Sequence, residues 1–246
     1  MRHVVALSLI MGCSSAAFAS DGVLFSNLPP APTQPGNYQD GIFSDAMSSQ
    51  GLNFYSQAFG QGFRIASDST VKSLRVWGAS EYVESTLPPE QQQLLSNNVT
   101  SLQVSIFRLG GQGTSYPVVA SWTISIADVL QARNGAFVPN IMSPVFQIDM
   151  NLGGNVSLTA GDYMLSIGGV LADPDGSAFA WISGRSDGSR PGESGYVTTG
   201  DIASQWGIWS PDSSGATGAM ELYGIPAPGA LAVLALAGRS RGRRRD

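Results

Sequence analysis

The chain has 246 residues, of which 43% are hydrophobic and only 13% are charged, about half the usual share of charge in a soluble protein. Its formal net charge is −5, but the segment 20–225 holds 17 acidic and 7 basic residues, a net charge of −10. Such an acidic domain argues against nucleic acid as a partner, since phosphate-binding surfaces are basic.

The N-terminal segment 1–19 is predicted to be a secretory signal peptide. It has a basic start, an apolar run and an A-x-A cleavage site formed by Ala17 and Ala19. We expect the export machinery to cleave after Ala19. One alternative is a lipoprotein signal that ends at a lipidated Cys13, which would leave the product anchored to a membrane. Another is an ordinary buried N-terminal helix.

The only histidine and the only cysteine, His3 and Cys13, both lie inside this signal. Without them, no Ser-His-Asp or Cys-His arrangement can form, and zinc lacks its usual ligands. The composition therefore predicts a protein that is not an enzyme of these classes.

The segment 20–225 is predicted to be one all-β domain, a single jelly-roll-like β-sandwich. A proline-rich stretch at 28–36 reads as an extended lead-in. After it, short segments alternate apolar and polar residues between Gly, Pro, Asn and Ser, which is the pattern of strands. These predicted strands cover 71–78, 102–107, 118–126, 145–150, 162–170, 178–183, 205–209 and 219–223. Short helical turns are expected only at 88–95 and 126–132, too few to cover a parallel sheet.

Carboxylates are the remaining groups with possible chemistry. Asp173 and Asp175, two residues apart and followed by Gly176, suit a hard cation such as Ca²⁺, or a plain turn between two strands. A carboxylate pair would also suffice for a polysaccharide hydrolase or lyase. The candidates for that pair are the same Asp173 and Asp175 together with Glu81, Glu84, Asp187 and Glu193.

All five tryptophans fall in predicted strands, where most should pack in the core. Trp206 and Trp209 are three residues apart, so in an extended strand they point to opposite faces and at least one can be exposed. With Tyr196 nearby, an exposed ring is a candidate contact for a glycan, and core packing is the alternative.

The C-terminal segment 226–246 combines a proline motif of Pro226, Ala227 and Pro228 with an apolar run at 229–238. A basic cluster follows, made of Arg239, Arg241, Arg243, Arg244 and Arg245. This order resembles the PEP-CTERM sorting signal of exopolysaccharide-producing Gram-negative bacteria, with Pro-Ala-Pro in place of Pro-Glu-Pro. The apolar run has ten residues, about 15 Å as a helix, against roughly 30 Å for the bilayer core.

The resemblance implies transient association with the inner membrane, processing by an exosortase-like enzyme, and delivery to the cell surface or the extracellular matrix. The middle of the chain is also similar to the β-sandwich ectodomains that precede such tails, through 77–78, 158–167, 179–181 and 221–224. Together these features predict a non-enzymatic exported protein with a structural or binding role, for which polysaccharide is a candidate partner. The alternatives are a carbohydrate-binding module and a carboxylate-based hydrolase or lyase.

Overall fold

The structure of the protein is a computed structural model. It describes residues 21–29, 41–43, 45–46, 58–80, 99–110, 116–138, 143–171, 179–182, 184, 195–197, 209–211 and 217–227.

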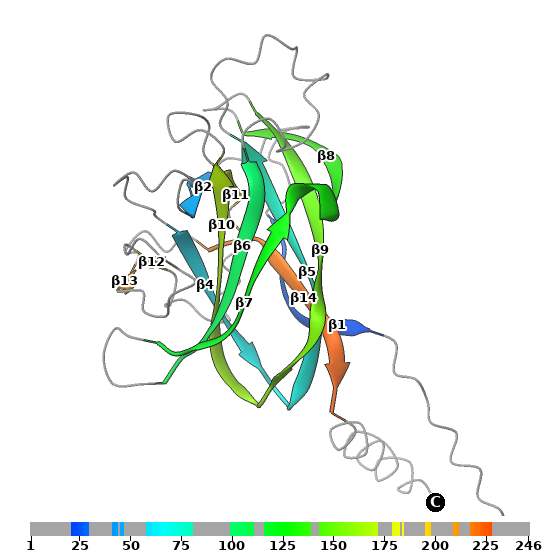
Figure 1. Cartoon of the computed structure of the whole chain (residues 1–246), viewed down its shortest axis with the longest axis vertical. Helices are drawn as coiled ribbons and strands as arrows, with labels where there is room; N and C mark the ends of the chain where they lie inside the picture. The colour runs from blue at the N-terminus through cyan, green and yellow to red at the C-terminus, as the bar shows by residue number, and fades with distance from the viewer. Residues whose placement is uncertain are drawn as a thin grey trace, which may run out of the picture.

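The described residues form two seven-stranded sheets (Figure 1), which we name the β5 sheet and the β10 sheet after a central strand of each. The β5 sheet contains β1 (Gly22–Asn27), β2 (Gly41–Phe43), β5 (Ser69–Ser80), β8 (Leu130–Val138), β9 (Ser143–Leu158), β11 (Phe179–Ile182) and β14 (Met220–Pro226). The β10 sheet contains β3 (Asp45–Ala46), β4 (Ala58–Ile65), β6 (Val99–Arg108), β7 (Val118–Ser125), β10 (Gly161–Leu171), β12 (Gly195–Val197) and β13 (Trp209–Pro211). The predicted all-β class is confirmed.

Pairing is antiparallel throughout, except where the short β3 runs parallel to β10. In the β5 sheet, β5 pairs with β9 on one side and with β14, then β11, on the other. β1 lies beyond β14, and β8 lies beyond β9. In the β10 sheet, β10 lies between β4 and β6, and β7 lies beyond β6.

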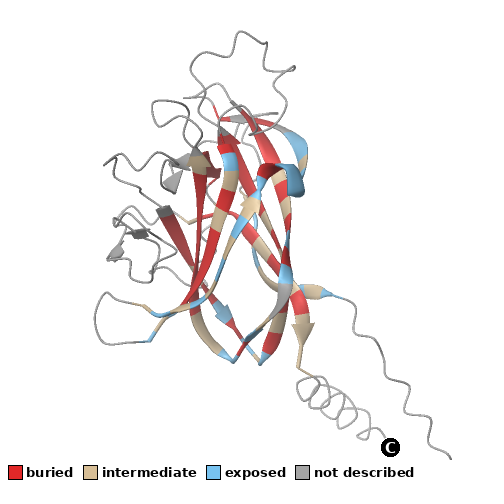
Figure 2. Ribbon diagram, viewed as in Figure 1, coloured by how far each residue is buried: buried red, intermediate tan, exposed pale blue. Residues whose placement is uncertain are grey.

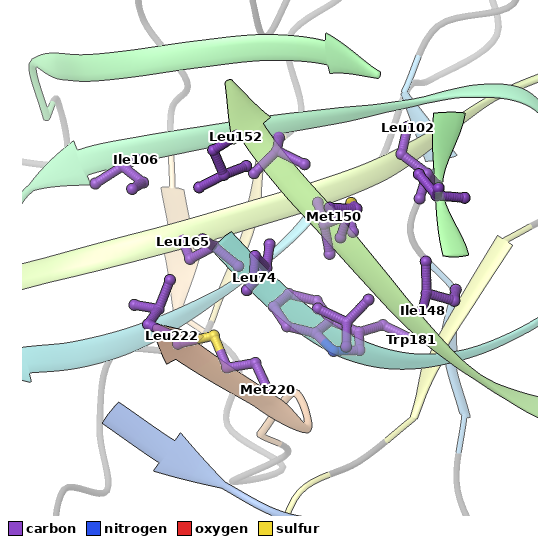
Figure 3. Close-up of a cluster of buried hydrophobic side chains, with 14 of the residues drawn as sticks. Leu74, Leu102, Ile106, Ile148, Met150, Leu152, Leu165, Trp181, Met220 and Leu222 are labelled. Atoms are coloured by element: carbon purple, nitrogen blue, oxygen red, sulfur yellow. The ribbon is translucent and has the colours of Figure 1, made fainter. Parts of the chain in front are cut away.

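The two sheets share one hydrophobic cluster, because each strand turns alternate apolar residues inward. Figure 3 shows Leu74, Met150 and Leu222 of the β5 sheet in this cluster with Leu102, Ile106 and Leu165 of the β10 sheet. Trp181 is fully buried there, and its ring meets the edge of Phe59 at 5.9 Å between centroids. Trp77 is also buried, whereas Trp122 is half-buried.

Two short corners carry the chain between the sheets at the same end of the molecule (Figure 1), one from β4 to β5 and one from β9 to β10. Asp68 joins them, because its Oδ1 accepts a hydrogen bond from the Ala160 amide (2.8 Å). Tyr163, buried, donates its hydroxyl proton to the Thr159 carbonyl (2.8 Å), much as a tyrosine corner does in other two-sheet proteins. These two hydrogen bonds hold the two corners in place at one end of the molecule, which we call the corner end.

The helix expected at 126–132 is wrong beyond its first turn. Only Ile126–Asp128 form a 3₁₀ helix (η3). Ser125 is its N-cap, because Ser125 Oγ accepts a hydrogen bond from the Ala127 amide (3.2 Å). From Leu130 the chain is strand β8, paired with β9 from Leu130 opposite Asp149 to Arg133 opposite Phe146. Pairing with a long neighbouring strand outweighs a weak local preference for helix.

The predicted strand set was incomplete. β1 and β4 were not predicted, and β9 continues to Leu158, beyond the expected end at 150. β13 begins at Trp209, so only the last residue of the predicted 205–209 strand is observed as strand, and 205–208 and 88–95 lie outside the described residues.

Candidate functional site

The outer face of the β5 sheet carries a row of side chains that crosses five neighbouring strands. Strand register places Ser26 opposite Glu221, Glu221 opposite Arg75, Arg75 opposite Asp149, and Asp149 opposite Leu130. We call these five residues the arginine row. They come from β1, β14, β5, β9 and β8, so the row exists only when the sheet has formed.

Strand alternation explains why this row faces outward. Leu74 and Val76 of β5 lie in the core, and the intervening Arg75 is half-buried on the other face. Met220 and Leu222 flank Glu221 in the same way on β14. Alternation and register therefore place Glu221, Arg75 and Asp149 side by side on the outer face of the β5 sheet.

Arg75 is held by two carboxylates. Its Nε and Nη2 donate to Oδ1 (2.6 Å) and Oδ2 (3.1 Å) of Asp149, and its Nη1 donates to Glu221 Oε2 (3.5 Å). The side chains are 31% (Arg75), 34% (Asp149) and 13% (Glu221) exposed, so the network is partly shielded from water. The hydrogen bonds that Arg75 donates to Asp149 raise the pKa of Arg75 above its ordinary value, which keeps the guanidinium charged.

Every carboxylate oxygen in this network accepts at least one hydrogen bond from the protein. Asp149 Oδ2 also accepts from Gln147 Nε2 (3.1 Å), and Glu221 Oε1 accepts from Ser26 Oγ (3.2 Å). Glu221 Oε2 accepts a short bond from the Tyr223 hydroxyl (2.6 Å). The carboxylates thus fix the position of Arg75 and engage three of its five N–H groups among the described residues.

The ring of Tyr223 packs against the guanidinium of Arg75. Its ring centroid lies 5.5 Å from the Arg75 Cζ, within cation–π range. Burial, together with the hydrogen bond to Glu221, raises the pKa of Tyr223 to about 12. The phenol therefore stays protonated and acts as a donor at neutral pH.

A groove of about 600 Å³ opens beside the arginine row. Its polar lining comes from Lys72, Arg75, Asp128, Asp149, Asn151 and Tyr223. Leu130, which is 76% exposed, adds an apolar wall. Asp21 also lines it and pairs with Lys72 at 3.3 Å. Two cations thus face three carboxylates, so the groove suits a neutral ligand better than an anionic one.

The residues predicted from sequence are only partly described. Tyr196 lies in β12 and Trp209 in the paired strand β13, with Tyr196 opposite Ser210 and Val197 opposite Trp209. Trp206, Asp173 and Asp175 lie outside the described residues, as do the loop carboxylates Glu81, Glu84, Asp187 and Glu193. In the part of the chain that the structure describes, no group of three His, Cys, Asp or Glu residues is placed to hold a metal ion.

The proline motif begins inside the fold. Pro226 is the last residue of β14, and the Ala227 amide donates to the Asp68 carbonyl (2.7 Å) at the corner end. Pro228, the five arginines of the basic cluster, Ala17, Ala19 and Cys13 lie outside the described residues. No helix within the described ranges is long and apolar enough to cross a membrane.

Sequence reasoning missed the arginine row. The carboxylates proposed from the sequence lie in loops between predicted strands. Arg75, Asp149 and Glu221 instead lie within strands, where each interrupts the alternation of apolar and polar residues. A charged residue in the middle of a predicted strand, with opposite charges in other strands, was the available signal. What the sequence lacked was the register, since Arg75 is 74 residues from Asp149 and 146 from Glu221.

Comparison with protein-family models, curated proteins and solved structures finds no match to this chain.

Proposed function

We propose that this chain is an exported bacterial protein that its C-terminal tail sorts to the cell surface or the exopolysaccharide matrix, where it has a structural or binding role. The observation that carries the proposal is the junction at Pro226 and Ala227. The last strand runs directly into the proline motif, and the bond from Ala227 to Asp68 fastens that junction to the corner end. The folded domain, or folded head, thus ends where the proposed sorting signal begins.

The rest of the proposal follows from the chain's organisation. The segment 1–19 is the signal peptide, 20–225 is one jelly-roll-like β-sandwich domain, and 226–246 is the PEP-CTERM-like tail. Two sheets that share one core support the sandwich assignment. The export machinery and an exosortase-like enzyme are the processing partners, with transient inner-membrane association in between.

The junction suggests a clean test of sorting. Deleting 228–246 removes the apolar run and the arginines but keeps β14 and the Ala227 bond, so the fold should be undisturbed. We expect the full chain in the surface or matrix fraction and the shortened chain free in the periplasm or medium. The same distribution for both would contradict the proposal. A control replaces Arg133, which lies on β8 opposite Phe146 and outside the deleted segment, by Gln.

A second candidate function is carbohydrate binding, which the groove favours. It offers hydrogen-bond donors from Arg75, acceptors from Asp128 and an apolar wall, with net negative charge. Concave sites of a few hundred Å³ with a few fixed polar groups are typical ligand sites. We propose that its ligand is a neutral glycan.

Steric blocking tests the groove without removing its charges. Ser73→Phe fills the groove lining, whereas Ser157→Phe places the same ring on an exposed part of β9 away from it. On a glycan array, we expect neutral glycans to bind the wild type and the Ser157 variant but not the Ser73 variant. Equal binding by all three would place recognition elsewhere, and preference for acidic glycans would contradict the charge argument.

We propose binding rather than catalysis, because two of the three carboxylates that line the groove are paired, Asp149 with Arg75 and Asp21 with Lys72. Glycoside hydrolysis uses two carboxyl groups that are available to exchange a proton or attack the sugar, and Asp128 alone would supply one. We therefore expect no release of reducing ends or unsaturated sugars from the host's exopolysaccharide. Turnover that disappears in Glu221→Gln would establish the enzyme alternative instead.

A further inference from the structure

We infer that strand β7 is a docking edge for a second copy of this chain, whose own β7 adds to it in antiparallel orientation. The pairing would join two β10 sheets into one continuous sheet across a two-fold axis. This inference is independent of the sorting proposal and of the groove, which lies on the other sheet.

The outer edge of β7 is open. β7 is the last strand of its sheet and pairs only with β6, from Ser101 opposite Ser125 to Phe107 opposite Val118. Among the described residues, no strand lies beyond it, and no backbone hydrogen bond outside the β6 ladder involves it. The N–H and C=O groups of alternate residues along this eight-residue strand point away from β6 and remain available for strand addition.

β7 also lacks most of the features with which proteins protect such edges. Its sequence, VVASWTIS, contains no charged residue, no proline and no glycine. Lysine, proline, bulges and short length are the usual protection against edge pairing. β7 has no lysine and no proline and runs for eight residues, and its single register shift, between Val118 and Ala120, leaves 120–125 in regular pairing with β6.

The other outer strands that the structure describes do carry such protection. β1 has a register shift between Val23 and Phe25, and β8 has one between Arg133 and Phe137. β2 and β13 are only three residues long, and β13 ends on Pro211. The register shift of β7 lies at one end of the strand, so β7 keeps six consecutive uncharged residues, 120–125, in regular pairing along an open edge.

The burial pattern along β7 indicates that the described part of the chain covers its side chains only in part. Its residues alternate between half-buried and exposed over the whole strand, as the tan and pale blue bands in Figure 2 show. Even the inward-facing Trp122 and Ile124, which pack against the core, stay only partly buried. On the outward face, Val119 is 40% exposed. A strand added at this edge would cover apolar surface on both faces.

The sequence of β7 fits a second β7 better than a charged partner. With two antiparallel copies centred on Trp122, Ala120 lies opposite Ile124, and Ser121 lies opposite Thr123. A small residue thus meets a large one, hydroxyl meets hydroxyl, and no like charges face each other, which is favourable cross-strand pairing. Two copies of a domain with net charge −10 repel elsewhere, so an uncharged strand is the place where they can approach.

Sedimentation velocity of the purified full chain over a range of concentrations tests this inference. The double variant Val119→Lys, Thr123→Lys places two charges on the exposed face of the edge, and Ser157→Lys places one on exposed β9 as a control. We expect a reversible dimer for the wild type and the control, and a dissociation constant raised at least tenfold in the double variant. A wild-type monomer at all concentrations, or a dimer that the double variant leaves unchanged, would overturn the inference.

Hydrogen exchange on the wild type gives a second measurement that does not depend on the variant folding. The amides of 118–125 should exchange more slowly at high protein concentration than at low concentration, while those of β5 should not change. Equal exchange of 118–125 at both concentrations would also overturn the inference.

Discussion

Replacing Arg75 by Met removes the one cation that lies between Asp149 and Glu221. Methionine keeps most of the aliphatic volume, so the change is mainly electrostatic. Three charge-assisted hydrogen bonds are lost, and two carboxylates are left close together without a counterion. Breaking an exposed ion pair costs up to about 1 kcal/mol and breaking a buried one about 3 to 5.

The Arg75 network lies between these limits, because its side chains are 31%, 34% and 13% exposed. We therefore expect a loss of about 2 kcal/mol in the free energy of unfolding, or about 4 to 8 °C in Tm. Urea unfolding at pH 7 measures the loss. The triple variant with Asp149→Asn and Glu221→Gln should recover most of the stability at pH 7.

Arg64→Met is the matched control. Arg64 makes the same two-bond contact with the directly opposite residue of a neighbouring strand, Asp162, at 2.7 Å for both bonds, but it is 52% exposed and has one carboxylate. It should change Tm little. If Arg64→Met and Arg75→Met destabilise the protein equally, or if the triple variant is no better than Arg75→Met, the reasoning is wrong.

Three further substitutions test the packing and the titration. Gly218→Ala should lower the free energy of unfolding in urea by about 1 to 3 kcal/mol, because a Cβ there would lie 2.5 Å from the Trp181 ring. Gly22→Ala is the control and should be nearly neutral, since the space around its Cβ is open. Gln61→Leu should cost about 1 to 3 kcal/mol, since it leaves the buried Gly218 amide without its acceptor at 2.8 Å; an unchanged midpoint would refute that role. Tyr223→Phe should remove an ionisation near pH 12 from the absorbance titration of the folded chain, because burial and the hydrogen bond to Glu221 raise the pKa of Tyr223 to about 12. Because its folded pKa lies above the ordinary tyrosine value of 10.0, the stability due to this group is present below pH 10 and lost as the pH rises to about 12. A Phe variant with the wild-type alkaline unfolding curve would contradict that sign.

The sequence predicted the strands whose alternation is regular. The segments 71–78, 102–107 and 162–170 became the centres of β5, β6 and β10, because Val, Leu and Ile on every second position must all be buried on one side. β4 escaped because Gly60 and Gly62 interrupt its pattern. It forms nevertheless, since Phe59 and Phe63 are buried and its backbone pairs with β10 over the whole strand.

The candidate site was beyond reach for a different reason. Each member of the arginine row looks like an isolated surface charge in its own strand, and only the register of β14, β5 and β9 brings the three together. Register depends on which strands become neighbours and on the bulge between Val71 and Ser73. Neither is encoded within a local window of sequence.

The mass of the mature protein tests the central proposal most directly. Intact-mass spectrometry of the chain recovered from the cell surface or matrix should give an N-terminus at Ser20 and a C-terminus within the proline motif at 226–228. That product keeps the folded head whole, since β14 ends at Pro226. Recovery of the unprocessed chain of 25.7 kDa, or of a chain confined to the cytoplasm, would contradict it.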